Sequence, residues 1–423
     1  MKLLEQRGLT WGGLVKLFIN NFRESGVRVT LRKALGQLSR TDVSFDIDRY
    51  RKWFVRYNTQ TGTRAPALFA SPSVIVIGSL DIPQCKKYRV MQKVEYFSAR
   101  SIPCEYAEYR DLTRAFSGMQ LATVAILYRV PMGPEYEALK QEADRLGLPL
   151  YYDIDDPIFD EATYRDNRNL DVLSAREREH LLAQIPGYKR VMEDVGRVIV
   201  STAGMSERVR SVTNVDTVIV WPNLIDSATQ NIFEQLPLHK AAANDQIALG
   251  YFSGSRAHDL DLDLVAGVLA KLLESDPRLQ LYLGGYTSLP ASLADLGDRI
   301  TFLGFMSYHA YLENLAAMDI HIVPLLIDQF NACKSGIRYL EASMCTVPTV
   351  ASSVGQFTEM IEDGVTGFLC SSPEDWQQAL TELTQNPQRR LDMAQAARLS
   401  VLASHCLSNE RYDTLAGEIV DVA

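Results

Sequence analysis

The chain of 423 residues lacks several features that would assign it to a class at once. It has no uninterrupted run of about 18 apolar residues, so we do not expect a membrane-spanning helix. Its N-terminus lacks the order of basic, apolar and small residues that marks a signal peptide. Its six cysteines show neither CxxC nor zinc-ligand spacing, which at this size predicts reduced thiols. We therefore expect a globular, cytoplasmic protein.

Positive charge is scarce over most of the chain. The net charge of −9 argues against nucleic acid as a partner, because general nucleic-acid binding needs a basic surface. Residues 1–64 are the exception, with 13 Lys and Arg against 5 Asp and Glu. Leu14, Leu17 and Phe18 recur there at helical spacing, with basic residues between them. Two roles stay open for this basic helical extension, residues 1–70: a cap on the next domain, or an interfacial segment for an anionic membrane surface.

From residue 72 onward, short apolar stretches alternate with helical stretches, and this alternation predicts an α/β fold with parallel, doubly wound sheets. We expect two Rossmann-like domains facing a cleft, at 71–225 and 226–400, and a final helix at 401–423 that packs back on the first domain. A polar, irregular linker is expected from residue 223 to 246. The strands are expected at 73–78, 104–109, 122–129, 148–155, 196–202, 216–223, 247–254, 279–286, 300–305, 320–325, 346–352 and 367–370. Helices are expected near 86–100 and at 133–146 in the first domain, and at 261–274 and 308–317 in the second.

One candidate site follows the strand at 247–254. Ser253, Gly254 and Ser255 allow a tight turn with exposed amides, and the N-terminus of the next helix favours negative charge. Arg256 adds donors that suit phosphate oxygens. An ordinary strand–helix turn explains the same residues equally well.

A second candidate site is FNACKSGIRYLEASMCTVPTV, residues 330–350. Lys334 and Ser335 are expected at a helix N-terminus, where a cation is unfavourable unless an anion offsets it. The lysine therefore suggests a bound anion, and Glu341, two turns further on, could accept hydrogen bonds from a sugar diol. The alternative is a surface pair between Arg338 and Glu341, which contributes only about 0.2–0.5 kcal/mol.

A third candidate is YYDIDDP, residues 151–157, at the expected end of a strand. Asp153 and Asp155 have the spacing of an Asp-x-Asp metal site for magnesium or manganese. The acids also suit a turn and helix cap. A third interpretation makes Asp155 or Asp156 a catalytic carboxylate that binds a substrate hydroxyl or accepts its proton. All three interpretations stay open.

Three segments together resemble retaining nucleotide-sugar glycosyltransferases of the GT-B fold. They are SGSRAHD (253–259), VPLLIDQFNACKSGIRYLEASMCTVPTVASSVGQFTEMIEDGVTGFLC (323–370) and VIVWPNLID (218–226). Within that fold they look most like the family 4 group, which builds bacterial surface polysaccharides such as O-antigen. The resemblance is strong over 247–400, moderate over 72–226, and does not extend to the first 65 or so residues.

The resemblance implies roles for several residues. Two glutamates separated by seven residues contact the donor in that family; the one that holds the ribose matches Glu341, whereas the one that contacts the transferred sugar matches Cys333. The family's cations on the diphosphate match Arg256 and Lys334, which together with Asp155 and Asp156 form our predicted catalytic set. The predicted donor-binding set is Ser253, Gly254, Ser255, Arg256, Asn331, Lys334, Ser335, Gly336 and Glu341.

This chain also departs from the family pattern. The common GRxxxxKG turn is replaced by SGSRAHD, and Lys334 lies in a different segment from the usual lysine. The family's histidine after the fourth strand is replaced by the acids at 153–156. Assigning that histidine's role to Asp155 or Asp156 is our extension of the resemblance.

The resemblance implies a hexosyltransferase-type enzyme that is retaining and independent of metals or other cofactors. It would move a sugar from a nucleotide-sugar donor to a glycan or lipid-linked glycan acceptor. Cys333 keeps a second function open, that of a catalytically silent sugar-nucleotide or glycan-binding scaffold. A dinucleotide-dependent oxidoreductase is disfavoured, because no GxGxxG follows the expected strands. The expected location is the cytoplasm, with peripheral attachment to the inner face of the membrane as an open alternative.

Overall fold

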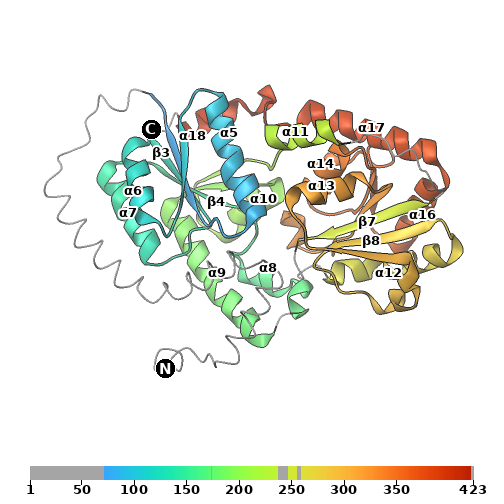
Figure 1. Ribbon diagram of the computed structural model, residues 1–423. Helices are drawn as coiled ribbons and strands as arrows, with labels where there is room; N and C mark the ends of the chain where they lie inside the picture. The colour runs from blue at the N-terminus through green and yellow to red at the C-terminus, as the bar shows by residue number, and fades with distance from the viewer. Residues whose placement is uncertain (1–70, 173, 237–245, 255–258, 421–423) are drawn as a thin grey trace, which may run out of the picture. The chain divides into compact units, whose positions relative to one another are not determined.

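The computed structural model describes residues 71–172, 174–236, 246–254 and 259–420. Two parallel, six-stranded sheets with helices on their faces make up the described chain (Figure 1). This confirms the α/β fold with two Rossmann-like units. The basic extension, residues 1–70, lies outside the described residues. Below, residues 71–225 are called the first half, and residues 226–400 the second half.

The first sheet has the strand order β2-β1-β3-β4-β5-β6. Every residue of β1, β3 and β4 is buried, as expected for a parallel sheet that is covered on both faces. Its strands are β1 (Val74–Gly78), β2 (Cys104–Glu108), β3 (Val124–Tyr128), β4 (Leu150–Ile154), β5 (Arg197–Val200) and β6 (Thr217–Val220).

The helices of the first half are more numerous than the two that the sequence patterns predicted. The predicted helix at 133–146 is α7, whereas the predicted helix near 86–100 is divided among three consecutive helical segments. These are α4 (Pro83–Cys85), the π-helix η2 (Lys86–Met91) and α5 (Gln92–Ala99), and the others are α6 (Leu112–Leu121), α7 (Pro134–Leu146), α8 (Glu161–Arg165), η3 (Arg168–Val172), α9 (Ala175–Val195) and α10 (Ala203–Val212).

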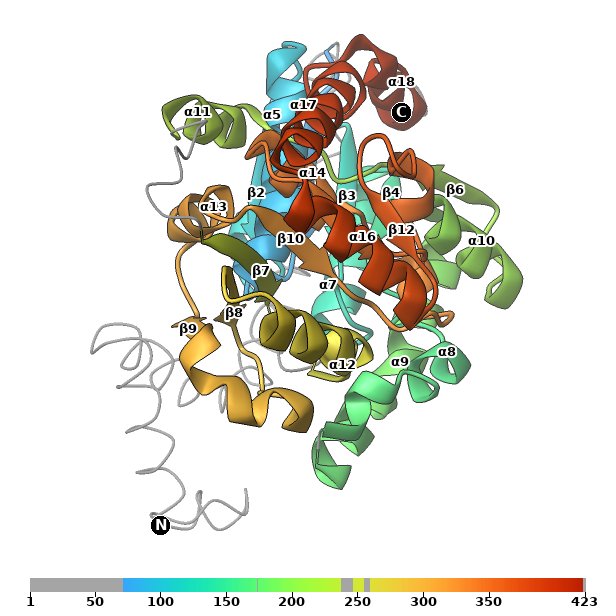
Figure 2. The same ribbon diagram turned by 90° about the vertical axis from the view of Figure 1, so that its right-hand side faces the viewer.

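The second sheet has the strand order β12-β11-β10-β7-β8-β9. Its strands are β7 (Ile247–Ser253), β8 (Leu279–Gly285), β9 (Ile300–Gly304), β10 (Ile320–Val323), β11 (Thr349–Ser352) and β12 (Phe368–Cys370). One face packs on α12 (Asp259–Ser275), η5 (Ala291–Arg299) and α16 (Pro373–Gln385). The other face packs on α13 (Tyr308–Ala316), α14 (Ile337–Met344), α15 (Phe357–Met360) and α17 (Pro387–Ser404) (Figure 2).

The connection between the halves differs from the irregular linker that the sequence predicted. Its first part forms the helix α11 (Ser227–Gln235). Asp226 caps this helix, because its carboxylate accepts a hydrogen bond of 2.8 Å from the amide of Thr229. The prediction of a loop was wrong because the polar residue Asp226 caps the start of a helix. Residues 237–245 of the same stretch are not described.

The C-terminal segment lies against the first sheet. Its elements are η7 (Glu410–Tyr412) and α18 (Thr414–Val420), whose apolar side chains join the core around β1 and β3. The hydroxyl of Tyr151 in β4 donates a hydrogen bond of 3.0 Å to the carbonyl of Glu418. The core of the first half thus includes residues from both ends of the described chain.

Each sheet has a point at which the strand order reverses, between β1 and β3 in the first sheet and between β7 and β10 in the second. Ligands of doubly wound sheets bind at the carboxyl ends of the strands that meet there. The candidate segments at 253–256 and 330–350 follow β7 and β10, so they lie at the reversal of the second sheet. Among the residues that the structure describes, no helix has the length and apolar character needed to cross a bilayer.

Candidate functional site

The segment that follows β10 forms the centre of the site. It contains the short 3₁₀ helix η6 (Asn331–Cys333) and then α14, whose N-cap is Gly336. Lys334 and Ser335 therefore precede the helix rather than forming its first turn. A Cβ at Gly336 would lie 2.4 Å from the sulfur of Met360, so a larger residue here would require the Met360 side chain to move. Its amide donates a hydrogen bond of 2.8 Å to Oε1 of Gln356.

Glu341 is enclosed by three tyrosines and is only 4% exposed. Tyr308 and Tyr311, from α13, donate hydrogen bonds of 2.8 and 2.9 Å to Oε1 and Oε2 respectively. Tyr88, from the first half, also donates to Oε1. Burial raises the pKa of Glu341, and the three hydroxyl donors partly offset that effect. The surface pair between Arg338 and Glu341 is not what the structure shows.

Lys334 belongs to a cluster of four charges that joins the halves. Its Nζ lies 2.7 Å from Oδ1 of Asp156, and Arg129 donates to Oδ2 of the same carboxylate at 2.5 Å. Arg129 also donates from Nε to Asp155 at 2.6 Å. Burial alone would raise the pKa of Asp156, but the ion pairs with Lys334 and Arg129 outweigh it and hold that pKa below its usual range. Asp156 is therefore an ionised carboxylate that is occupied by two cations.

Arg129 is a site residue that the sequence analysis missed. It follows β3 at the reversal of the first sheet and has a φ of +46°, which is uncommon for a residue other than glycine. Such backbone strain is concentrated at functional sites. The sequence alone offers no signal for it, since only the fold brings Arg129 to Asp155 and Asp156.

Arg338, in the first turn of α14, is a cation that no described residue neutralises. Its Nη1 is buried without a hydrogen-bond partner among the residues described. Beneath it in β10, His321 is fully buried, and neither ring nitrogen has a partner among those residues. Burial, and secondarily the charge of Arg338, lowers the pKa of His321 to about 3. A guanidinium near a helix N-terminus is unfavourable unless an anion accompanies it, so this arrangement suits an anionic ligand.

Cys333 lies in the contact between the halves and is 2% exposed. Its carbonyl accepts a hydrogen bond of 3.0 Å from Thr202, the N-cap of α10. A Cβ at Gly204 would lie 2.4 Å from the carbonyl of Ala332, so α10 approaches η6 closely at its first turn. Burial raises the pKa of Cys333 to about 12, which keeps it a neutral thiol. The position matched to a sugar-contacting acid therefore holds an uncharged, packed side chain.

A buried polar network in the first half supports this contact. Arg89 and Lys93 are fully buried and both pair with Asp153, so Asp153 does not share a site with Asp155. Arg89 also donates a hydrogen bond of 3.0 Å to Asn223, which donates one of 3.1 Å to Ser335. Arg89 is therefore a buried partner of Asp153 and is not exposed to solvent.

Of the other predicted donor-binding residues, the structure describes Asn331, Ser253 and Gly254. Asn331 is buried, and its side chain donates to the carbonyl of Leu326 at 3.0 Å, which shapes the loop. Ser253 ends β7 in a buried position, and Gly254 follows it on the surface. Ser255 and Arg256 lie outside the described residues. The structure thus places Lys334, Ser335, Gly336 and Glu341 on one segment after β10 and brings Asp156 to Lys334.

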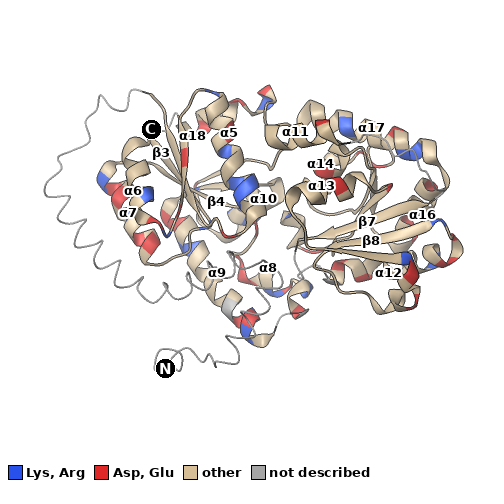
Figure 3. Ribbon diagram, in the orientation of Figure 1, with Lys and Arg blue, Asp and Glu red and all other residues tan. Residues whose placement is uncertain are grey.

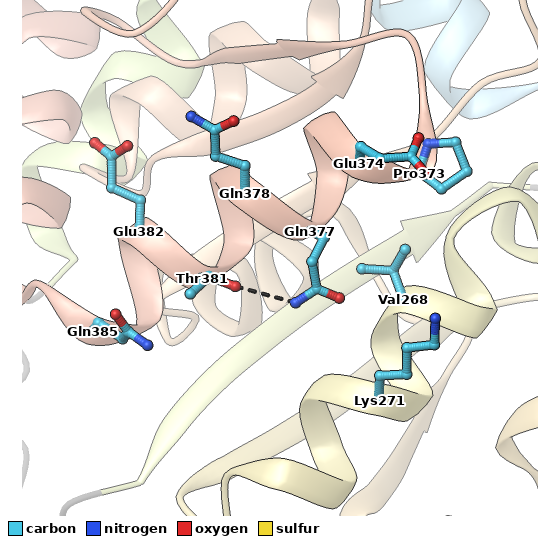
Figure 4. A pocket seen from close by; sticks show the side chains of 9 residues that line it. All are labelled: Val268, Lys271, Pro373, Glu374, Gln377, Gln378, Thr381, Glu382 and Gln385. Carbon is cyan, nitrogen blue, oxygen red and sulfur yellow. Dashed lines mark hydrogen bonds between the residues drawn. The ribbon is translucent and has the colours of Figure 1, made fainter.

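A surface groove of about 540 Å³ lies between α12 and α16, away from this site (Figure 4). Most of its lining residues are polar, but apolar atoms contribute most of its wall surface. The side-chain amide of Gln377 donates a hydrogen bond of 3.1 Å to Thr381 across one turn of α16. None of the residues that line the groove belongs to the site described above. Figure 3 shows that acidic and basic residues are both scattered over the helices of the two halves.

Comparison with known proteins places this site in context. Residues 248–386 match the family model described as "Glycosyl transferases group 1". The D-inositol 3-phosphate glycosyltransferase of Stackebrandtia nassauensis is 28% identical over 246 residues, which cover 53% of this chain and 54% of that protein. The chain thus spans about half the length of this relative.

Solved structures share the fold. HepE from Anabaena, in complex with UDP and glucose, aligns with a TM-score of 0.57 at 14% identity, covering 83% of this chain and 100% of its own. WaaG, a glycosyltransferase involved in lipopolysaccharide biosynthesis, aligns with a TM-score of 0.55 at 15% identity, covering 82% and 99%. The two sheets have the GT-B arrangement of glycosyltransferases, and the second half carries the sequence pattern of the group 1 family.

Proposed function

We propose that the protein is a glycosyltransferase that moves a sugar from a nucleoside diphosphate sugar to an acceptor hydroxyl. One observation carries the proposal: the start of α14, at the reversal of the second sheet, presents Arg338, which no described residue neutralises, one turn before Glu341. A guanidinium suits the diphosphate, and a carboxylate suits the ribose diol. The group 1 match over residues 248–386 supports the same assignment.

The proposed chemistry follows from the leaving group. A nucleoside diphosphate gains negative charge as it departs, so preorganised cations and amides near α14 lower the barrier. Asp155 and Asp156 are both engaged by Arg129. This pairing supports our proposal that the reaction is metal-independent, because the guanidinium of Arg129 already neutralises the carboxylates that would have to bind a metal ion. We also propose retention of the anomeric configuration, on the family resemblance alone.

The proposed acceptor is a glycan or a lipid-linked glycan. The relative from Stackebrandtia is named for D-inositol 3-phosphate, and WaaG for lipopolysaccharide biosynthesis. D-inositol 3-phosphate is a polyol phosphate, and lipopolysaccharide is a lipid-linked glycan, so both names support an acceptor that carries hydroxyl groups. The basic residues 1–64 fit an acceptor held at an anionic membrane surface, and we propose this attachment together with a cytoplasmic location.

A thermal-shift screen of the purified protein with UDP-, GDP- and dTDP-sugars tests the donor class, because a ligand that binds the folded state stabilises it. We expect at least one donor to raise the melting temperature, and Arg338→Ala and Glu341→Ala to reduce that rise. No shift with any donor would contradict the proposal. Addition of EDTA to an active assay tests metal independence, and activity lost with EDTA and restored by manganese would contradict it.

One observation favours a second function, that of a silent nucleotide-sugar-binding scaffold. The packed thiol of Cys333 stands where the family resemblance puts an acid that contacts the sugar. A scaffold would show the same thermal shift but no release of nucleoside diphosphate with any acceptor. Cys333→Glu tests this second function. In a scaffold that lost its active site, the restored acid should give rise to turnover. In an enzyme that uses another group, it should not increase turnover.

A further inference from the structure

Two side chains of the first half contact groups of the proposed donor site. One of these groups is Glu341, proposed for the ribose, and the other is Lys334, one of the cations near α14 proposed for the diphosphate. Tyr88 donates its hydroxyl to Glu341, and Asp156 places its carboxylate 2.7 Å from Nζ of Lys334. The tyrosine hydroxyl donates to the carboxylate as a ribose hydroxyl would. The Asp156 carboxylate pairs with the lysine ammonium as a phosphate oxygen would. Both contacts join different halves of the protein.

We propose that Tyr88 and Asp156 occupy the donor site in the free protein and are exchanged for the ribose and the diphosphate when a nucleotide sugar binds. This inference rests on the proposed function. It makes Tyr88 a residue that sets donor affinity, although it lies in the half that does not hold the donor.

Burial makes the exchange at Glu341 necessary. Glu341 is 4% exposed and Tyr88 is 7% exposed, so a ribose cannot reach the carboxylate while the tyrosine remains. Tyr308 and Tyr311 come from the same half as Glu341 and hold Oε1 and Oε2 in place. Tyr88 alone among the three can leave by a movement between the halves. Its hydroxyl also lies 3.0 Å from that of Tyr308, so its departure also frees an acceptor position on the Tyr308 oxygen.

The exchange at Lys334 is independent of the first. Asp156 keeps its second cation, Arg129, when Lys334 turns to a phosphate. The carboxylate is therefore not left unpaired in the liganded state, which keeps the exchange small in free energy. Lys334 and Asp156 are each about a quarter exposed, so a phosphate can approach them from solvent.

The two contacts predict that each variant changes the affinity for a different fragment of the ligand: Tyr88→Phe for the nucleoside and Asp156→Asn for pyrophosphate. Calorimetric titration of the full chain with UDP, GDP, their nucleosides uridine and guanosine, and inorganic pyrophosphate tests this prediction. Tyr88→Phe removes the competitor for the ribose, so the preferred diphosphate and its nucleoside should bind roughly five- to twentyfold more tightly, with pyrophosphate unchanged. Asp156→Asn should tighten the diphosphate and pyrophosphate and leave the nucleoside unchanged.

Matched controls come from the same chain. Tyr151→Phe deletes a buried hydroxyl that bonds the carbonyl of Glu418, and Asp144→Asn deletes an exposed carboxylate that pairs with Lys140. Neither should alter any affinity. In the double variant Tyr88→Phe/Glu341→Gln, the gain from Tyr88→Phe should vanish, because the carboxylate for which the ribose and the tyrosine compete is gone.

The outcomes separate this inference from the proposed function. If Glu341→Gln weakens the nucleoside while Tyr88→Phe leaves it unchanged or weakens it, the exchange is wrong and the proposed function stands. If the wild type binds neither diphosphate, both fail together. Unfolding of each variant without ligand verifies that it folds. Tyr88→Phe should lose at least as much stability as Tyr151→Phe, because Tyr88 donates to a carboxylate and Tyr151 to a carbonyl.

Discussion

At the scale of single residues, the site is defined by which charges have partners and which do not. Lys334, Asp155, Asp156 and Arg129 neutralise one another, whereas Arg338 has no partner among the described residues. An unneutralised guanidinium beside a helix N-terminus lowers the stability of the free protein and raises its affinity for an anion.

Arg338→Gln should therefore act in opposite directions on stability and on binding. We expect the free energy of unfolding without ligand to stay equal or to rise, and the affinity for a nucleoside diphosphate to fall roughly 10- to 100-fold. Denaturant unfolding and calorimetry measure the two quantities. Arg278→Gln removes an exposed arginine that pairs with Asp276 and serves as the control. A variant that is destabilised but binds normally would assign Arg338 a structural role.

His321 predicts an acid sensitivity of the fold. Its pKa in the folded protein is about 3, whereas an unfolded histidine titrates near 6.5. The unfolded state therefore binds a proton that the folded state refuses, and stability is lost as pH falls from about 6.5 towards 3. The slope is about 1.4 kcal/mol per pH unit.

His321→Phe should remove the contribution of His321 and leave that of His405, whose pKa burial lowers to about 4. His309→Gln, which changes an exposed histidine, should leave both contributions. Chemical denaturation at several pH values between about 4 and 7 measures the difference. Equal pH dependence in wild type and His321→Phe would show that His321 is not the group responsible.

Only part of the candidate site could be predicted from the sequence. Lys334 and Glu341 could be expected from their own segment, because helix spacing and family resemblance are local properties. Tyr88 and Arg129 could not, because they meet that segment only through the packing of one half on the other. Nothing in their own neighbourhoods distinguishes them from surface or core residues.

At the scale of elements, helix starts and buried strands were predictable and irregular helices were not. The helix expected at 133–146 is α7, bounded by Pro134 at its start and by Gly147, which has a φ of +59°, after its end. By contrast, Lys86–Met91 forms a π-helix that hydrophobic periodicity does not reveal. That π-helix carries Tyr88 and Arg89, so the irregular element is also the one that serves the site.

The contact of α10 with η6 predicts opposite effects for two glycines in helices. Gly204→Ala would place its Cβ 2.4 Å from the carbonyl of Ala332 and should destabilise the protein by about 1–3 kcal/mol. Gly267→Ala, in α12, meets nothing within 4 Å and should stabilise it by about 0.5–1 kcal/mol. Denaturant unfolding measures both, and a neutral Gly204→Ala would mean that α10 and η6 do not touch in solution.

At the scale of the whole molecule, the two sheets and their order of strands account for where the site lies. Both candidate segments of the second half follow the strands at its reversal point, as the fold rule requires. The sequence predicted this arrangement because alternating strands and helices allow few topologies. The irregular linker was predicted wrongly, because α11 begins at a polar cap.

Residues 1–64 lead to a prediction for the whole chain. Their net charge of +8 favours an anionic bilayer, with a contribution of about 1 kcal/mol for each basic residue near its surface. Deleting residues 1–64 should move the protein from vesicles containing phosphatidylserine to the supernatant in a sedimentation assay. Vesicles of phosphatidylcholine alone are the control, and unchanged sedimentation of the deletion variant would remove the membrane role.

The transfer reaction itself is the most direct test. The purified full chain is incubated with each nucleotide sugar and with glycan or inositol phosphate acceptors, and mass spectrometry follows both products. We expect an acceptor that gains one sugar, an equal amount of free nucleoside diphosphate, and a loss of both products in Arg338→Ala and Glu341→Ala. Donor binding without any glycosylated product, or transfer that neither variant reduces, would contradict it.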